Sequence, residues 1–531
     1  MAQQQSPQTV TLTIDGKEVT VPKGTMILRA AEAAGIKIPH YCYHPGLSSP
    51  AMCRLCLVEV EGWPKLAPSC KTAVAEGQVV LTQSEKARSQ RQGVLEFYLV
   101  NHPLDCPICD MAGECHLQDY VHAEGREHGR GREPKRVLGR DDFGGDVLFN
   151  GDRCVMCTRC VRFMREVAED ERLCVVERGS RAIIDTFFDQ GLEGSPFAGN
   201  IVDICPVGAL VSKDFLFKAR AWDLDHTPSI CPSCSQGCNI QLHTRDNLVQ
   251  RLKPRENLEV NGWWMCDFGR HNYEWMNRAD RLEEPHVDGR VTEWPGALES
   301  LLGRLKEAQG DVKAIAWAHS PNEEMGLLKA LVEALGGGEV VYRSPKTEDE
   351  VVLPGFPLLA RRKDLAPNVK GAELMGLQRV GDDEARGGLD DLRNHTGVLV
   401  VVGDPLLDLD ESFGAKARLF VYLGSYLSKA ASNAHFVLPS STFAEQEGTF
   451  TNVQGRVQRF WPGLRAPGSS RPGWMILGAL LAELTEAEAP SRADRAFSML
   501  ADAVPAFAGI TYRDMGTRGA LVNEPAGVAG D

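Results

Sequence analysis

Apolar and polar side chains alternate near the amino terminus in the manner of two short strands. Residues 10–14 and 17–21 carry this alternation, and the dipeptide Asp15-Gly16 between them is typical of a type I′ hairpin turn. Residues 24–34 then place apolar side chains at helical spacing, and Gly35 is a typical helix stop. We therefore expect two strands and a helix before the first cysteine.

The same periodicities predict further elements along the chain. Ser84 is a typical N-cap for a helix from Glu85 towards Val100, and residues 240–243 and 248–252 resemble paired strands. One face of the expected helix carries Ala87, Val94, Leu95 and Tyr98. The longest apolar run, residues 474–484, is too short to cross a membrane, so we expect a buried helix there and no membrane insertion.

Beyond about residue 285 the pattern changes to apolar strands separated by helices. Strands are expected at residues 314–318, 340–342, 397–404 and 419–423, with a helix at 322–335. Strands this apolar are typical of a parallel sheet buried on both faces. This alternation indicates an α/β, Rossmann-like domain. No G-x-G-x-x-G follows a strand here, so NADH is not expected on this chain.

Length and charge restrict the possible classes of protein. The 531 residues should form three or more domains, and an excess of Asp+Glu (72) over Lys+Arg (58) without a long basic run excludes nucleic acid as an expected partner. Residues 1–5 lack the basic start and apolar core of a signal peptide, and residues 524–531 resemble a flexible tail. We expect a cytoplasmic, multidomain protein.

The sixteen cysteines are the most informative residues of the sequence about function. All of them precede residue 267, and fifteen fall into four spaced groups. Disulfide-rich proteins are small and secreted, whereas this chain is large. The grouping therefore indicates metal centres in a reducing cytosol.

One group has three cysteines on a single tight loop. After 44 intervening residues, the spacing C-x2-C-x2-C is followed by Cys205-Pro206, and in bacterial ferredoxins such a Cys-Pro serves the other cluster of a pair. The positions that would complete a second cluster hold Ser195, Ala198 and Ile201. One 4Fe–4S cluster is therefore expected on Cys154, Cys157, Cys160 and Cys205. Cys174 lies in an apolar, strand-like segment and is expected to be a buried structural thiol.

The first group has the spacing C-x10-C-x2-C-x13-C, whose first interval is longer than in plant-type ferredoxins. It follows strand, strand and helix, the β-grasp order of that class, and so suits a 2Fe–2S centre. Its members are Cys42, Cys53, Cys56 and Cys70. Small polar neighbours that could donate hydrogen bonds to the sulfurs are Ser48, Ser49, Ser69 and Thr72.

The second group, H-x3-C-x2-C-x5-C, supplies only three thiolates for a 4Fe–4S cluster. They are Cys106, Cys109 and Cys115. The fourth position could be filled by His102, His116 or Asp105, and spacing alone does not decide between them. A histidine ligand would make the cluster less negative and easier to reduce.

The fourth group has the looser spacing C-x2-C-x3-C with one distant cysteine. It consists of Cys231, Cys234, Cys238 and Cys266. A 4Fe–4S cluster is expected. Structural zinc is the alternative for each of the three groups of four cysteines, most seriously for this one.

The order of these motifs resembles the large iron–sulfur subunit of respiratory complex I, the bacterial NADH-quinone oxidoreductase protein that corresponds to the mitochondrial 75-kDa subunit. Residues 154–163 and 199–210 carry the resemblance most closely, and it covers about residues 8–280. It implies that His102 is the fourth ligand of the second group.

The fourth group resembles the first domain of molybdopterin oxidoreductases, and residues 445–458 resemble part of their pterin-binding fold. Because the remaining half is short and has no cysteine, we expect a trimmed scaffold without molybdopterin.

The expected fold class is a multidomain α+β and α/β protein with five parts. They are a β-grasp 2Fe–2S domain (1–83), a helical 4Fe–4S segment with one histidine and three cysteine ligands (84–135), a degenerate bacterial-type ferredoxin domain (136–222), a 4Fe–4S molybdopterin-oxidoreductase domain (223–284) and a reduced molybdopterin-oxidoreductase-like α/β domain (285–531).

The resemblance implies an electron-transfer subunit of proton-pumping NADH-quinone oxidoreductase with one 2Fe–2S and three 4Fe–4S clusters. Electrons would come from NADH through a flavin-bearing partner subunit and leave through another iron–sulfur subunit toward quinone. The chain would lie on the cytoplasmic face of the bacterial inner membrane, connected only indirectly to the membrane arm. No general base or nucleophile is evident, so no catalytic residue is expected. The alternatives are a subunit of an NAD-linked formate dehydrogenase or the diaphorase subunit of a hydrogenase.

Overall fold

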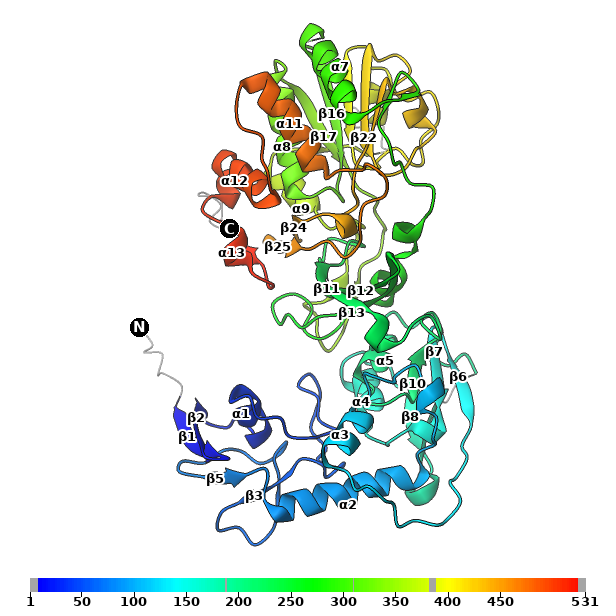
Figure 1. Cartoon of the computed structure of the whole chain (residues 1–531), viewed down its shortest axis with the longest axis vertical. Helices are drawn as coiled ribbons and strands as arrows, with labels where there is room; N and C mark the ends of the chain where they lie inside the picture. The colour runs from blue at the N-terminus through cyan, green and yellow to red at the C-terminus, as the bar shows by residue number, and fades with distance from the viewer. Residues whose placement is uncertain (1–7, 187–188, 309, 382–387, 524–531) are drawn as a thin grey trace. The chain divides into compact units, whose positions relative to one another are not determined.

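The computed structural model describes residues 8–186, 189–308, 310–381 and 388–523 (Figure 1). It divides into two compact units, one of residues 1–224 with 353–356 and one of residues 225–352 with 357–531. The expectations for a signal peptide and a flexible tail concern residues 1–5 and 524–531, which lie outside the described residues. Each unit is described by itself below.

The first unit begins with a mixed five-stranded sheet of order β2-β1-β5-β3-β4. Its strands are β1 (Thr9–Ile14), β2 (Lys17–Pro22), β3 (Leu57–Val60), β4 (Ala67–Pro68) and β5 (Val79–Leu81). The turn between β1 and β2 has positive φ at Asp15 (47°) and Gly16 (81°), as a type I′ hairpin requires. Helix α1 (Ile27–Ala33) packs its buried residues onto this sheet, and begins three residues later than its apolar pattern predicts.

Helix α2 (Glu85–Asn101) confirms the predicted cap, because the Ser84 side chain accepts a hydrogen bond from the Ala87 amide. Its buried face includes a charged residue that the apolar pattern did not predict. Arg91 is fully buried, donates to the Thr82 carbonyl (2.7 Å) and pairs with Glu124 of α3 (His116–Glu124). This ion pair joins α2 to α3.

A small α/β region completes the first unit. A three-stranded sheet of order β10-β7-β6 is formed by β6 (Arg140–Gly144), β7 (Val147–Asn150) and β10 (Leu210–Ser212). The other elements are α4 (Arg159–Glu166), the hairpin β8 (Leu173–Val176) with β9 (Ile183–Thr186), and α5 (Asn200–Ile204). Phe143 and Phe149 stack in its core with ring centroids 4.7 Å apart.

The second unit opens with an antiparallel three-stranded sheet. Its strands are β11 (Asp225–Ile230), β12 (Asn239–Arg245) and β13 (Leu248–Pro254), so the predicted pairing of residues 240–243 with 248–252 is confirmed. The short helix α6 (Asp267–His271) and the 3-10 turn η5 (Glu274–Asn277) follow.

An eight-stranded sheet dominates the second unit, with order β15-β14-β23-β22-β21-β16-β17-β20. Its strands are β14 (His286–Val287), β15 (Arg290–Val291), β16 (Val312–Trp317), β17 (Gly338–Arg343), β20 (Gln378–Arg379), β21 (Val398–Val402), β22 (Leu419–Gly424) and β23 (Phe436–Pro439). The six strands from β23 to β20 pair in parallel, so the predicted parallel sheet is confirmed.

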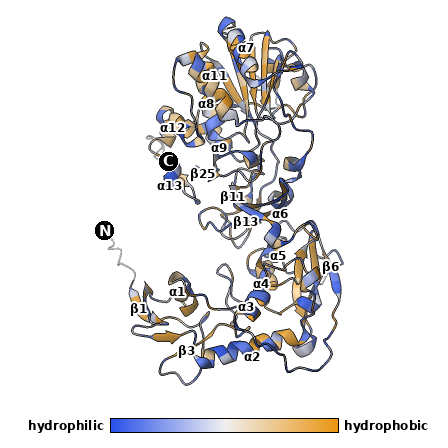
Figure 2. Cartoon of the chain, in the orientation of Figure 1, coloured by the Kyte–Doolittle hydropathy of each residue, from blue (hydrophilic) through white to orange (hydrophobic). Residues whose placement is uncertain are grey.

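Both faces of this sheet are buried, and alternate residues of one strand enter different cores. Ala314 and Ala316 of β16 pack with α7 (Trp294–Glu307), α8 (Asn322–Ala334) and α11 (Gly473–Thr485). Ile315 packs on the other face with α10 (Leu389–Arg393). Figure 2 shows apolar residues gathered in these strands. The run at residues 474–484 is the predicted buried helix α11.

A three-stranded sheet of β24 (Gly448–Thr451), β25 (Arg456–Phe460) and β26 (Ala520–Leu521) adjoins α8. The remaining elements of this unit are β18 (Val351–Val352), β19 (Ala360–Arg361), α9 (Val369–Leu374), α12 (Ala493–Ala503) and α13 (Tyr512–Met515). Among the described residues, no helix has the length and apolar character that a membrane span needs.

Candidate metal centres

The four cysteines of the first group lie together, buried in the first unit. All four thiols are at most 4% exposed. The hydrogen bond between the Cys53 and Cys42 thiols is the main reason why the pKa of Cys53 is raised, and Cys70 interacts with both Cys42 and Cys56. The Tyr41 amide donates to Cys53 Sγ (3.4 Å). The loops therefore hold four sulfurs together and offer one of them a backbone donor.

Two of the four polar neighbours lie close to the thiols, as predicted. The Ser69 hydroxyl is buried and helps to lower the pKa of Cys56, after the larger effect of Cys70. Ser49 donates to the carbonyl of Cys70 (3.2 Å). The expectation was wrong for the other two, because Ser48 donates to Glu166 (2.6 Å) and Thr72 donates to the Pro68 carbonyl (3.0 Å).

The second group surrounds a cavity of about 390 Å³. The residues of the motif that line it are His102, Cys106, Cys109 and Cys115. His102 follows the last turn of α2, and burial, reinforced by nearby Arg153, lowers its pKa to about 4. A neutral imidazole is the form that binds metal. This side chain is therefore in the right state and place to act as a ligand near neutral pH.

The other two candidates for the fourth position are placed differently. Asp105 lines the same cavity, but its carboxylate accepts two hydrogen bonds from Arg153 (3.0 and 2.8 Å). His116 begins α3 outside the cavity lining, and its ring lies 5.8 Å from that of Tyr120. The geometry thus favours His102 over both alternatives.

The third group lines another cavity of the first unit. Its cysteines are Cys154, Cys157, Cys160 and Cys205. The loop before α4 bends through left-handed residues Met156 (φ 49°) and Thr158 (φ 57°), and the Met156 amide donates to Cys154 Sγ (3.3 Å). Burial raises the pKa of Cys154 and of Cys205 to about 12. Metal binding here must therefore displace thiol protons.

Cys174 lies apart from this cavity, in β8. Its thiol donates to the Asp185 carbonyl of the paired strand β9 (3.5 Å). The expectation of a buried thiol was wrong, because Cys174 is only half-buried. The hairpin β8–β9 alternates its side chains between two faces and leaves neighbouring Val175 exposed.

Two buried arginines tie the first and third groups together. Arg159 of α4 donates to the carbonyls of Tyr43 (2.5 Å) and Ile204 (3.1 Å). Arg162, one turn later, contacts carbonyls in the loops of both groups. Neither arginine was predicted to have this role, although both lie in the segment of residues 154–163 that carries the family resemblance.

Three tyrosines fill the space among the three groups of the first unit. The ring of Tyr41 lies 5.2 Å from that of Tyr98 and 5.5 Å from that of Tyr120. Tyr98 is within electrostatic range of thiols of the first and third groups. Tyr41 is within range of Cys115 of the second group and of Cys53. The spacing of these three tyrosines in the sequence did not predict that their rings lie together.

The fourth group lies in the second unit, where its thiols are at most 4% exposed. They belong to Cys231, Cys234, Cys238 and Cys266. The Cys231 amide donates to the Cys238 carbonyl (2.8 Å), and the Gly269 amide donates to Cys266 Sγ (3.4 Å). Burial raises the pKa of Cys231 to about 12.

Two glycines let the backbone approach the sulfurs of the second and fourth groups closely. A Cβ at Gly208 would collide with Cys109 Sγ, and a Cβ at Gly269 would lie 2.9 Å from Cys231 Sγ. Only glycine permits the backbone to approach the sulfurs so closely. Across the described residues, no three His, Cys, Asp or Glu side chains are arranged to hold a single metal ion. Sets of four thiols, or of three thiols with an imidazole, are donor sets of iron–sulfur clusters.

Five family models match successive parts of the chain. They describe a 2Fe-2S iron-sulfur cluster binding domain (7–85), an NADH-ubiquinone oxidoreductase-G iron-sulfur binding region (91–130), an NADH-quinone oxidoreductase subunit 3 ferredoxin-like domain (144–211), a molybdopterin oxidoreductase Fe4S4 domain (224–278) and molybdopterin oxidoreductase (396–483). The predicted series of 2Fe–2S, 4Fe–4S, ferredoxin-like and molybdopterin-oxidoreductase domains is thereby confirmed.

Curated relatives carry matching names. The G subunit of NADH-quinone oxidoreductase from Rickettsia conorii is 40% identical over 62% of this chain and 49% of its own length. The mitochondrial NADH dehydrogenase [ubiquinone] iron-sulfur protein 1 of Solanum tuberosum is 42% identical over 62% of this chain and 45% of its own.

This chain thus spans about half the length of these two relatives. The match to the mitochondrial NADH-ubiquinone oxidoreductase 78 kDa subunit of Candida albicans is longer, at 30% identity over 89% of this chain and 82% of that protein. The chain therefore belongs to the family of the large iron–sulfur subunit of NADH-quinone oxidoreductase, which includes the bacterial protein and its mitochondrial counterpart.

Proposed function

We propose that this chain is an electron-transfer subunit of a proton-pumping NADH-quinone oxidoreductase. The observation that carries the proposal is the shared environment of three cysteine groups in one compact unit. Tyr98 and Tyr41 each lie within electrostatic range of thiols from two groups. Three redox centres whose ligands share neighbouring tyrosines in one compact unit would suit the passage of electrons from one to the next.

The proposed ligand sets are those of the four motifs, and two of the sets line cavities. One 2Fe–2S cluster would be held by Cys42, Cys53, Cys56 and Cys70. Three 4Fe–4S clusters would be held by His102, Cys106, Cys109 and Cys115, by Cys154, Cys157, Cys160 and Cys205, and by Cys231, Cys234, Cys238 and Cys266. When bound, such clusters accept and release single electrons.

The residues of the chain would tune these centres. Backbone donors to Cys53, Cys154 and Cys266 stabilise the negative charge of the sulfurs and so raise the reduction potential. Neutral His102 in place of a thiolate acts in the same direction. Burial shields all thiols of the first and fourth groups from water, whereas Cys106 of the second group is exposed.

The remaining parts would serve as scaffold. The first sheet with α1 would be a β-grasp domain, and the eight-stranded sheet a trimmed molybdopterin-oxidoreductase fold without molybdopterin. We propose a flavin-bearing, NADH-oxidising subunit and further iron–sulfur subunits as partners. The chain would lie at the cytoplasmic face of the bacterial inner membrane and contact the membrane arm only indirectly.

Metal analysis of the anaerobically purified chain tests the cofactors. About fourteen iron atoms with matching sulfide are expected from one 2Fe–2S and three 4Fe–4S clusters. Zinc in place of four iron atoms would reassign the Cys231 group to a structural zinc site.

Replacement of one candidate ligand tests the function in the purified complex. Cys154→Ala should abolish quinone reduction while flavin-site oxidation of NADH by an artificial acceptor continues. Cys174→Ala is the matched control, because it removes a thiol of the same region that lies outside the cavity, and it should leave quinone reduction unchanged. Retained quinone reduction in Cys154→Ala would contradict the proposal.

A further inference from the structure

A cavity of about 330 Å³ lies in the second unit, at the carboxyl ends of the parallel strands. Loops after β16, β21 and β22 contribute His319, Asp404 and Tyr426 to its lining. The segment that carries the fourth cysteine group contributes Ser233 and Trp275. Because β17 and β21 lie on opposite sides of β16, the strand order reverses at this edge of the sheet. Parallel α/β sheets bind ligands at such positions.

Aromatic side chains form much of the wall. Trp317 and His319 stack with centroids 5.0 Å apart and planes 17° apart. The rings of Trp275 and Phe443 lie 6.0 Å from each other, and Tyr426 lines the same space. Burial lowers the pKa of His319 to about 4, so its ring is uncharged near neutral pH. Flat aromatic surfaces of this kind favour a planar ring as ligand.

Polar atoms in the lining lack partners. Among the described residues, His319 Nδ1, Ser441 Oγ and Gln446 Oε1 are buried and make no hydrogen bond. Ser441 and Gln446 are 5% and 3% exposed. A buried polar atom without a partner costs free energy, which a bound ligand with matching donors and acceptors would recover. Gln446 Oε1 can only accept, so the ligand must carry an N–H or O–H group.

The charges of the lining disfavour an anion. Among the described residues that line the cavity, two are carboxyls, Glu324 and Asp404, and a single one, Arg278, is a permanent cation. Burial raises the pKa of both carboxyls. The Arg278 guanidinium is paired with Asp280 and lies 4.4 Å over the Tyr426 ring. Phosphate sites in proteins gather several basic side chains or glycine-rich backbone amides, and the described lining has neither.

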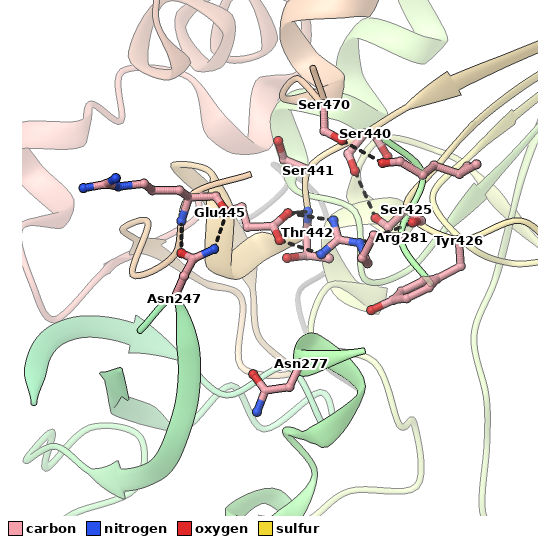
Figure 3. A network of polar contacts seen from close by, with 12 residues as sticks. Asn247, Asn277, Arg281, Ser425, Tyr426, Ser440, Ser441, Thr442, Glu445 and Ser470 are labelled. Carbon is pink, nitrogen blue, oxygen red and sulfur yellow. Dashed lines mark hydrogen bonds and ion pairs between the residues drawn. The ribbon is translucent and has the colours of Figure 1, made fainter. Parts of the chain in front are cut away.

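A buried ion pair outside the lining holds the loop that carries Thr442, which does line the cavity. Arg281 and Glu445, 5% and 3% exposed, form two hydrogen bonds, and Glu445 accepts a third from the Thr442 amide (2.8 Å). Figure 3 shows Ser441 and Tyr426 near this pair. Asp404 accepts hydrogen bonds from the Ser425 (2.9 Å) and Tyr426 (3.2 Å) amides. The loops are thus held in place without a ligand.

We propose that this cavity binds a planar nitrogen heterocycle without a phosphate group, of the class of a purine nucleoside. The aromatic wall of the cavity would stack on the ring, and Gln446 Oε1 would accept a hydrogen bond from a ring amino group. Ser441 Oγ and His319 Nδ1 would form hydrogen bonds with other polar atoms at the edge of the ring. The volume stands at the lower end of small-ligand sites, which suits one nucleoside and excludes a dinucleotide. The site is separate from the electron-transfer role proposed for the first unit.

Adenosine titrated into the full chain with its clusters in place tests the proposal. Saturable quenching of tryptophan fluorescence is expected, since Trp275 and Trp317 line the cavity, and calorimetry should give the same Kd. AMP should bind about tenfold more weakly because the described lining offers its phosphate only Arg278, which is already paired with Asp280. Purine riboside, which lacks the amino group, should also bind about tenfold more weakly because Gln446 Oε1 loses its donor.

Substitutions in the lining test whether adenosine binds in this cavity. Gln446→Leu should weaken adenosine about tenfold and Ser441→Phe should abolish binding, because the added ring fills the cavity. Gln250→Leu is the matched control in β13, outside the lining, and should bind like the unchanged chain. Thermal unfolding and cluster absorbance check that each variant is folded. Lack of saturable adenosine binding, AMP binding as tightly as adenosine, or unchanged binding in Gln446→Leu would each overturn the proposal.

Discussion

The Arg162 guanidinium donates a 2.5 Å hydrogen bond to the carbonyl oxygen of Cys42, although 120 residues separate them along the chain. It also donates to the carbonyls of Cys157 (3.3 Å) and Ser48. One side chain therefore ties the loop of the first cysteine group to that of the third. An arginine can do this because its planar guanidinium presents five donors in fixed directions.

Arg162→Leu should weaken both loops at once. Each buried carbonyl left without a donor costs about 1–3 kcal/mol, so the free energy of unfolding of the first unit should fall by about 3 kcal/mol or more. Electron paramagnetic resonance should show loss of the 2Fe–2S signal together with that of the Cys154 group. Arg165→Leu on the same helix is the control, because that side chain is 60% exposed. A variant that lost only one of the two signals would contradict the bridging role.

Gly208→Ala should selectively disturb the second group. The added Cβ would collide with Cys109 Sγ, so the sulfur must move out of position. We expect loss of about four iron atoms per chain, with the other cluster signals retained. Gly93→Ala in α2, where a Cβ meets nothing within 4 Å, should change neither the iron content nor the fold. Full iron content in Gly208→Ala would show that the cavity tolerates a larger residue.

A buried carboxyl should make the second unit less stable as the pH rises. Burial raises the pKa of Glu323 from its ordinary value near 4.5 to about 7, while hydrogen bonds from Tyr512 and Thr449 oppose the shift. Between these values the folded chain keeps a proton that the unfolded chain releases, so raising the pH lowers the free energy of unfolding. The loss from this group is about 3 kcal/mol and is complete above pH 7.

Glu323→Gln should remove that part of the pH dependence. Denaturant unfolding at several pH values between about 5.5 and 8.5, followed by hydrogen exchange in α8 and β24, measures it. Glu333→Gln on the exposed side of the same helix is the control and should keep the slope of the unchanged chain. Equal slopes in both variants would mean that Glu323 is ionised in the folded state at all these pH values.

Tyr41→Phe should stabilise the first unit. The Tyr41 hydroxyl is buried and has no hydrogen-bond partner among the described residues. Its removal should raise the free energy of unfolding by about 1 kcal/mol. Tyr98→Phe is the contrasting change, because the Tyr98 hydroxyl donates to the Cys53 carbonyl (3.4 Å), and it should lower stability. Thermal unfolding of the two variants should therefore shift in opposite directions.

Much of the fold could be predicted because its signals are local. The turn at Asp15-Gly16, the cap at Ser84 and the apolar strands such as β21 each depend on neighbouring residues. The four cysteine groups could also be recognised from the sequence, since ligands on one loop keep a fixed spacing. The match of residues 154–163 to a known family added what spacing could not, namely the preference for His102.

Other features could not be predicted because they depend on contacts between distant segments. Arg91 resembles a surface residue of an amphipathic helix until α3 supplies Glu124 as its partner. Gly208 looks like an ordinary loop glycine until Cys109 is placed beside it. The nucleoside cavity requires the strand order of the sheet, which no single segment encodes.

Cys106 differs from the other fifteen cysteines, all of which lie in the described residues, in being exposed to solvent. A sulfur that water can reach is also reached by dissolved oxidants, and oxidation of thiols begins where they are most accessible. Cys106 is therefore the point from which oxidative damage should enter the isolated chain. Air exposure before assembly should oxidise the Cys106 thiol to its sulfenic or sulfonic form before any other cysteine of the chain. A partner protein that covered Cys106 would protect it from this oxidation.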